Sequence, residues 1–345
     1  MNTSTEQPSW KDILAPYERP QTRSAVIQIA TSLLPYLALS AIAYLTLGHI
    51  SIWFTLLIAV PSSGFLIRTF VVFHDCAHGS LLPSRKANVR IGAVLGLFVL
   101  TPYARWKHEH AVHHATSGDL DRRGVGDVYT LTVSEYNALP FKSRLAYRLF
   151  RNPLIMFGIG PIFAMIIGPR IVGKDARPRM RNSVLYTDAV LATIFALMFV
   201  FLGWQFVAEV WAPGALLAGS GGIWLFYVQH QFEDAYWQTG ENWDYAEAAL
   251  QGSTYLKLPK ILQFFSGSIG LHHVHHLNHK IPNYHLQSAH DSHPVFSQVP
   301  TIGIADGMRA VRFKLIDERS GKLVTFAQAR HSVAHATPTA AGANA

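Results

Sequence analysis

The chain has 345 residues, of which 50% are hydrophobic and only 14% are charged, against about 25% in a typical soluble domain. This composition favours a membrane protein. The net charge of +8 is compatible with nucleic acid binding, but long uncharged apolar runs argue against it, and we expect no nucleic acid partner. The single cysteine, Cys76, excludes an intramolecular disulfide and any zinc or iron–sulfur site built from several cysteines of this chain.

Four long apolar segments occur in two closely spaced pairs. A run of about 20 apolar residues crosses the roughly 30 Å hydrocarbon core of a bilayer, and residues 25–47 form such a run without any charge. Residues 50–73 form a second run, interrupted only by Arg68 near its end. Residues 184–204 and 213–229 form the second pair, with aromatic residues at their ends as at a membrane interface. We therefore predict four transmembrane helices in two hairpins.

Two further apolar stretches, residues 91–104 and 153–169, are short, and the second contains several glycines and prolines. If only four segments cross, both termini, residues 74–183 and everything after residue 230 share one side. Eight basic residues and one acid, Asp175, lie between positions 144 and 181, which marks that side as cytoplasmic by the positive-inside rule. We therefore predict that residues 153–169 form an interfacial or re-entrant helix.

Together these features predict an all-α integral membrane protein in which a cytoplasmic helical cap covers the two hairpins. Residues 1–23 are polar and lack a cleavable secretory signal, so we expect a cytoplasmic N-terminal arm. Residues 24–330 then form a single membrane domain. The Ala- and Thr-rich residues 331–345 are expected to be a disordered tail.

Histidine is unusually frequent, with 18 residues, and it gathers in three short motifs on the predicted cytoplasmic side. His74 and His78 are four residues apart at the end of the second apolar run, which places them on one face of a helix. The pattern HxxHH occurs twice, and its i, i+3, i+4 spacing also places three imidazoles on one face. The eight histidines in this register are His74, His78, His110, His113, His114, His272, His275 and His276.

Eight imidazoles exceed what one metal ion takes, since four to six ligands complete a centre. We therefore predict a site for two metal ions. Imidazole binds zinc, copper, iron and nickel, so spacing alone leaves the metal open. Acidic residues near the motifs are expected to orient the imidazoles, and the candidates are Asp75, Glu109, Asp119 and Asp234. Asn283 is either a further orienting residue or a turn residue.

Histidines outside this register are expected to be surface, core or orienting residues. They are His49, His108, His273, His279, His285, His290, His293, His331 and His335.

With these motifs the chain resembles the membrane-bound fatty acid desaturases, and most of all the bacterial acyl-lipid desaturases. The resemblance covers about residues 25–300 and rests on four segments in this order: HDCAHGS, RWKHEHAVHHATSGDLDRRGVGDVYTLT, YVQHQFEDAYW and GSIGLHHVHHLNHKIPNY. It implies an integral protein of a bacterial inner membrane whose histidine motifs and termini face the cytoplasm.

The resemblance further implies an enzyme with two iron ions that uses O2 to insert a cis double bond into a lipid-linked fatty acyl chain. The ligands it implies are the eight histidines above and a ninth, His230 of YVQHQ. Some relatives have an Asn one helical turn earlier, where this chain has Phe226. No catalytic residue beyond the metal ligands is implied. We also expect an apolar tunnel that enters from the membrane and runs under the histidines.

Each turnover of such an enzyme needs two electrons, and the sequence carries no flavin, dinucleotide or iron–sulfur motif. We therefore expect an external electron donor, a ferredoxin or a flavodoxin. Basic residues of the cytoplasmic face either steer an acidic donor or contact anionic lipid headgroups. They are Arg105, Lys107, Arg122, Arg123 and Lys280.

Two other functions fit parts of the pattern. Di-iron membrane hydroxylases of alkyl or carotenoid substrates have similar histidine motifs, but they tend to space the middle motif as HxxxHH, whereas HxxHH occurs twice here. A metal carrier is expected to place ionisable ligands within its spans, and these spans are nearly free of them. The pattern therefore favours the desaturase.

Overall fold

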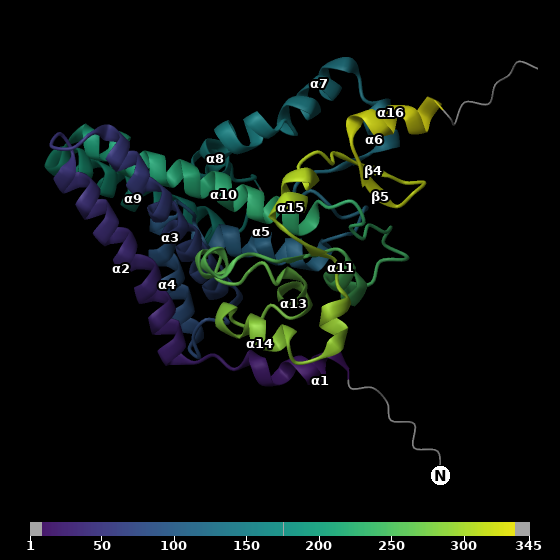
Figure 1. Ribbon diagram of the computed structural model, residues 1–345, viewed down its shortest axis with the longest axis horizontal. Coiled ribbons are helices and arrows are strands. Elements are labelled where there is room, and N and C mark those ends of the chain that lie inside the picture. The colour runs from purple at the N-terminus through teal and green to yellow at the C-terminus, as the bar shows by residue number, and fades with distance from the viewer. Residues whose placement is uncertain (1–8, 175, 335–345) are drawn as a thin grey trace, which may run out of the picture.

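The computed structural model describes residues 9–174 and 176–334, and most of them are helical. Figure 1 shows the long helices α2, α3, α4, α9 and α10 gathered on one side and the short C-terminal elements on the other. In the predicted N-terminal arm, a short helix α1 (Trp10–Leu14) is followed by a single 3-10 turn, η1 (Ala15–Glu18). Residues 1–8 of that arm and residues 335–345 of the predicted tail lie outside the described residues.

Three helical stretches of the described chain are long and apolar enough to cross a membrane. The first two are α2 (Thr22–Thr46) and α3 (Ile52–His78), which agree with the predicted spans 25–47 and 50–73. The third covers Pro178–His230 and consists of α9 (Pro178–Gln205), a π-helical segment η5 (Phe206–Trp211) and α10 (Ala212–His230). It therefore contains both members of the second predicted pair.

The third stretch is not one straight rod. Gly203 has φ 81° and ψ 165°, a conformation outside the helical region that glycine adopts easily. The rings of Phe195 and Trp211 lie 4.9 Å apart between centroids, whereas sixteen residues of straight helix would separate them by about 24 Å. The chain thus folds back between α9 and α10.

Two bent helix pairs pass the same test of length and hydropathy together, which would raise the number of candidate spans to five. Helix α4 (Arg85–Phe98) meets α5 (Tyr103–Thr116) at 100°. Helix α7 (Phe141–Phe150) meets Ile155–Arg170 at 59°. This last segment covers most of the ambiguous stretch 153–169 and consists of η2 (Ile155–Ile159), α8 (Gly160–Ile162), η3 (Phe163–Ile167) and η4 (Gly168–Arg170).

Helix α3 is the central element, since α2, α4, α5 and α10 all pack on it. It ends at His78 because Gly79 adopts the left-handed conformation with φ 80°. The Gly79 N–H then donates to the carbonyl of Asp75 at 2.9 Å. This glycine cap stops the helix directly after the two histidines at its end.

The remaining described elements are short, and we refer to them together as the cap. Its helices are α6 (Val133–Ala138), α11 (Tyr245–Gln251), α12 (Lys260–Phe265), α13 (His272–Leu277), η6 (Asn283–His285), α14 (Leu286–His290), η7 (Pro294–Gln298), α15 (Ile304–Ala310) and α16 (Phe326–Ala334). Helix α16 thus extends into the predicted tail 331–345.

Five short strands of the described residues make two small sheets, which the all-α prediction did not foresee. Strand β1 (Leu131–Thr132) pairs in parallel with β4 (Leu315–Asp317), with Leu131 opposite Leu315, and β4 pairs antiparallel with β5 (Lys322–Val324). Strand β2 (Tyr255–Leu256) pairs in parallel with β3 (Thr301–Ile302). Each strand has two or three residues, which is too short to produce a readable alternation of apolar and polar positions.

Candidate metal centre

Nine histidines from four helices come together between the long helices and the cap. His74 and His78 lie in the last two turns of α3, and His230 is the last residue of α10. Helix α5 carries His110, His113 and His114, and α13 carries His272, His275 and His276. These are the nine residues that the sequence and the resemblance singled out. Eight of the side chains are buried, and His78 is half-buried.

The nine histidines form two groups, and within each group one nitrogen of every residue lies within 4.8 Å of the others. One group has five members, His74, His78, His110, His114 and His275, and the other has four, His113, His230, His272 and His276. The two HxxHH helices contribute in opposite ways. Helix α5 gives its i, i+4 pair to the first group and its middle histidine to the second, whereas α13 does the reverse.

The ring nitrogens face one another in a way that a shared cation explains. His114 Nε2 lies 3.1 Å from His110 Nε2 and 3.0 Å from His275 Nε2, and His272 Nε2 lies 2.9 Å from His230 Nε2. Two nitrogens that are each about 2.1 Å from one ion, at a right angle, are also about 3.0 Å apart. Among the described residues, four further buried Nε2 atoms have no hydrogen-bond partner, those of His74, His78, His113 and His276. The donor set therefore fits two bound metal ions.

The histidines of α13 are held in the form that binds metal. Burial, reinforced by the neighbouring imidazoles, lowers the pKa of His272, His275 and His276 well below its usual value. Neutral imidazole has a free lone pair, which a metal ion requires.

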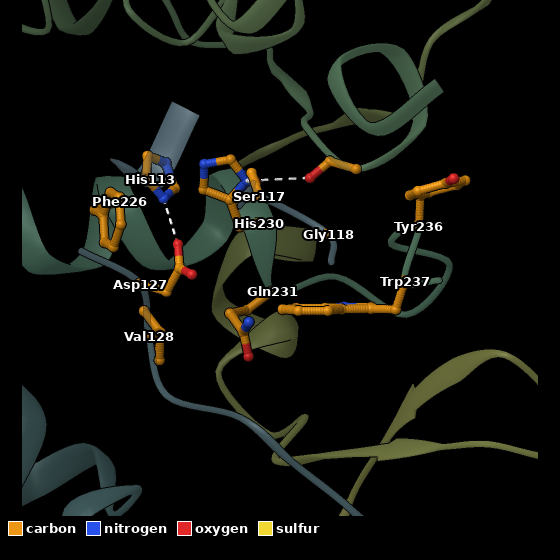
Figure 2. A pocket seen from close by; sticks show the side chains of 11 residues that line it. His113, Ser117, Gly118, Asp127, Val128, Phe226, His230, Gln231, Tyr236 and Trp237 are labelled. Atoms are coloured by element: carbon orange, nitrogen blue, oxygen red, sulfur yellow. Dashed lines mark hydrogen bonds and ion pairs between the residues drawn. The ribbon is translucent and has the colours of Figure 1, made fainter. Parts of the chain in front are cut away.

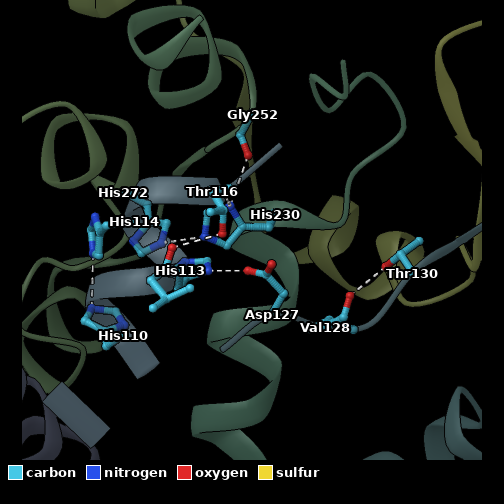
Figure 3. Close-up of polar contacts among 12 residues, drawn as sticks. His110, His113, His114, Thr116, Asp127, Val128, Thr130, His230, Gly252 and His272 are labelled. Atoms are coloured by element: carbon cyan, nitrogen blue, oxygen red, sulfur yellow. Dashed lines mark hydrogen bonds and ion pairs between the residues drawn. The ribbon is translucent and has the colours of Figure 1, made fainter. Parts of the chain in front are cut away.

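Contacts of the Nδ1 atom fix the orientation of three of the histidine rings. His113 Nδ1–H donates to a carboxylate oxygen of Asp127, and His230 Nδ1–H donates to the carbonyl of Gly252 at 3.1 Å (Figure 3). His74 Nδ1 lies 3.2 Å from a carboxylate oxygen of Asp75. A proton on Nδ1 leaves Nε2 as the free acceptor that points to the centre.

Of the four acidic residues predicted to orient imidazoles, only Asp75 contacts one. Its second oxygen also accepts the backbone N–H of Asn283 at 2.7 Å. The other three pair with basic residues instead: Glu109 with Arg105, Asp119 with Arg122, and Asp234 with Lys322. The orienting residue that the sequence analysis missed is Asp127, which lies in a loop fourteen residues after His113 and shows no helical register with it.

The off-register histidines from His49 to His293 lie outside both groups, and His335 lies outside the described residues. His108 is exposed on α5, and His273 makes a separate contact with His290, at 3.0 Å between ring nitrogens. His285 Nδ1–H donates to the carbonyl of Tyr17. His279 lies nearest to the centre, with its ring centroid 5.0 Å from that of His78.

A small pocket adjoins the four-histidine group (Figure 2). Its volume is about 10 Å³, which is enough for one water molecule but not for an acyl chain. Phe226, Asp127 and Trp237 contribute to its walls beside His113 and His230. The acyl tunnel therefore stays a prediction that requires side chains to move.

Aromatic rings cover the centre near the long helices. Trp106 stacks on His110 with ring centroids 4.3 Å apart and planes 19° from parallel. Phe226 packs 5.3 Å from His113. A phenyl ring thus occupies the place where some resembling proteins have an Asn, so no side-chain hydrogen bond is made toward the centre at this position.

A model of the family "Fatty acid desaturase" matches residues 48–300, which is well over half of the chain. The chain belongs to the fatty acid desaturase family. A fatty acid desaturase of Bacillus subtilis is 43% identical over 92% of this chain and 90% of its own length. Members of this family are oxidoreductases, and so is this protein.

Two desaturases of Synechocystis are more distant relatives. An sn-1 oleoyl-lipid 12-desaturase is 29% identical over 74% of this chain and 73% of its own length. An sn-1 acyl-lipid omega-3 desaturase (ferredoxin) is 30% identical over 64% of this chain and 62% of its own length. The matched family region contains all nine clustered histidines.

Proposed function

We propose that this desaturase introduces a cis double bond into a lipid-linked fatty acyl chain, with O2 as cosubstrate, two iron ions as cofactor and electrons from an external donor. The observation that carries the proposal is the pair of buried imidazole groups in a family member. The relatives that act on acyl-lipids support the choice of substrate.

The two groups of five and four histidines would hold the ions, which is the role we assign to all nine residues. Bound iron supplies the oxidising power that no side chain has, because hydrogen must leave an unactivated carbon. The protein's part is to orient the ligands through Asp127, Asp75 and the Gly252 carbonyl. Trp106 and Phe226 cover the rings with apolar surface and keep water away from the reacting carbon.

The exposed surface of the long helices suits a membrane-embedded substrate. Leu45 on α2 and Val200 on α9 are 72% and 76% exposed, as is normal for side chains that meet lipid tails. We infer a bacterial inner membrane crossed by α2, α3, α9 and α10, with the histidines and both termini on the cytoplasmic side. The support is the excess of basic residues in the connection between the two helix pairs.

The electron donor is proposed to be a ferredoxin or a flavodoxin, and one relative's name specifies ferredoxin. Steering by the five basic residues has little support, because four of them pair with carboxylates. The fifth, Lys107, contacts the carbonyl of Ala77. This face therefore presents less free positive charge than its sequence indicates.

The proposal is tested by expressing the protein in cells whose lipids contain only saturated chains. We expect new monounsaturated chains on intact lipids, located by lipid mass spectrometry, and none from a His275→Ala variant expressed at the same level. Hydroxylated chains in place of unsaturated ones would contradict the proposal and indicate the hydroxylase instead.

A further inference from the structure

On the cap side, the centre is covered by a thin layer that contains two aromatic side chains. Trp243 and Tyr245 line a small space together with His114 and His276, one histidine from each of the two groups. Tyr245 begins α11, which packs directly on α13. The two rings are therefore immediate neighbours of the metal-binding helices.

Both aromatics are hydrogen-bonded to the backbone of a ligand-bearing segment. The Tyr245 hydroxyl donates to the carbonyl of His276 at 2.5 Å. The Trp243 indole N–H donates to the carbonyl of Ser117 at 2.9 Å. Ser117 caps α5, and its own N–H donates to the carbonyl of His113. Each ring thus has a continuous path of bonds and hydrogen bonds to a histidine of the centre.

The same two side chains reach the surface. Trp243 and Tyr245 are half-buried, and the Arg122 guanidinium lies 5.0 Å over the Trp243 ring. The half-buried Trp10 of α1 lies 6.4 Å from Tyr245 and extends the aromatic surface. In Figure 1, α11 and α13 lie on the opposite side of the molecule from the far ends of α2 and α9. In the topology proposed above, this aromatic face lies on the cytoplasmic, water-exposed side.

Desaturation has a redox balance that the chain cannot close alone. The acyl chain loses two hydrogen atoms, O2 takes them up with two further protons and two further electrons, and two water molecules form. The chain has a single cysteine and no flavin or dinucleotide motif, so the two electrons come from a carrier protein.

We propose that a one-electron carrier protein docks on the face formed by Trp10, Trp243 and Tyr245, and that its electrons reach the centre through Trp243 and Tyr245. The proposal rests on the proposed di-iron function. In each transfer the carrier is oxidised by one electron and one ferric ion becomes ferrous. The aromatic side chains bridge the gap and end the step unchanged. Electron entry and lipid entry then use opposite sides of the histidine cluster.

The test is stopped-flow reduction of the oxidised, iron-loaded protein by a reduced plant-type [2Fe–2S] ferredoxin. We expect Trp243→Leu and Tyr245→Phe each to slow this reduction roughly tenfold or more, within the one to three decades that association rates vary among variants of one interface. Iron content and reduction by dithionite, which needs no docking face, should stay at the level of the unmodified protein.

Trp224→Leu is the matched control, because Trp224 is half-buried like Trp243 but lies on α10, and its indole nitrogen has no hydrogen-bond partner among the described residues. Its ferredoxin rate should be unchanged. Unchanged ferredoxin rates in both Trp243→Leu and Tyr245→Phe would overturn the inference. A parallel loss of iron or of dithionite reduction would also overturn it, because it would indicate a purely structural role. Failure of the proposed function is distinct: the unmodified protein would then bind no iron or form no double bond with dithionite, O2 and lipid.

Discussion

His113 and His114 are adjacent in the chain, yet they belong to different groups of the candidate centre. Neighbouring residues of a helix point about 100° apart, so one helix can present ligands to two ions. The opposite contributions of α5 and α13 follow from this geometry. Each helix contributes two imidazoles to one group and one imidazole to the other. Both groups are therefore built on both helices.

Replacing any one of the nine histidines by alanine is expected to reduce bound iron and abolish desaturation. Removal of a mere orienting partner lowers metal affinity by roughly 10- to 100-fold, and loss of a ligand should cost more. Iron content of the purified variants measures the effect. His108→Ala is the control on the same helix, because His108 is exposed. Full iron content in two of the nine variants would contradict the ligand assignment.

Asp127 is expected to act on iron through His113. Asp127→Ala should lower iron affinity by about 10- to 100-fold, because His113 loses the acceptor that fixes its tautomer and ring orientation. Asp127→Asn should be milder, since the amide oxygen can still accept the Nδ1 proton. Glu109→Ala is the control, as Glu109 pairs with Arg105. Equal iron affinity in Asp127→Ala and Glu109→Ala would argue against the orienting role.

The buried histidines of α13 make folding dependent on pH. In the native, metal-free protein the pKa of His276 is lowered by burial, whereas in the unfolded chain it is about 6.5. The unfolded chain therefore binds more protons below pH 6.5, and stability is complete above that pH and falls as the pH drops below it. We expect the melting temperature of metal-free protein to fall between pH 7 and pH 5. In His276→Leu the decline should be shallower, and an equal slope would contradict this origin.

Among the secondary-structure elements, the close packing of α4 against the start of α5 depends on one glycine. A β-carbon at Gly92 of α4 would lie 2.2 Å from the Tyr103 ring and 2.9 Å from the Cys76 β-carbon. Tyr103 is the first residue of α5, and its hydroxyl donates to the carbonyl of Cys76 in α3 at 2.7 Å. The absence of a side chain at Gly92 thus lets α5 anchor on α3 between His74 and His78.

Gly92→Ala is expected to destabilise the protein by about 1–3 kcal/mol, the usual cost of overpacking a close contact. Because Tyr103 would shift, iron retention should fall as well. The melting temperature and iron content measure both effects. Gly158→Ala is the matched control, because a β-carbon there meets nothing within 4 Å. A Gly92→Ala variant as stable as this control would show that α4 and α5 can separate without harm.

At the scale of the whole molecule, the proposed topology places the turn between α2 and α3 across the membrane from the cap. Cysteines introduced at the exposed positions His49, Lys142 and Lys280 test it, since the native Cys76 is buried. With a membrane-impermeant thiol reagent, His49→Cys should be labelled from outside the cell. Lys142→Cys and Lys280→Cys should react only after the membrane is opened. Labelling of all three from one side would contradict the four-span arrangement.

The long apolar helices and the histidines that share a helical face are predictable from the amino-acid order alone. Both follow from local rules, since the length of an apolar run sets whether it can span lipid and a period of 3.6 residues sets which side chains align. Spacing identified eight of the nine clustered histidines directly. His230 needed the resemblance, because a single histidine at a helix end has no periodic partner.

How these helices and histidines combine depends on the three-dimensional packing of the chain. Three features join residues from separate helices and loops. They are the division into five and four histidines, the contact of Asp127 with His113, and the packing of Trp243 and Tyr245 beside His114 and His276. Such contacts depend on helix crossing angles and on the path of irregular loops, which carry no periodic signal. Helical periodicity therefore fixes which imidazoles face the same way, but packing alone fixes which of them meet.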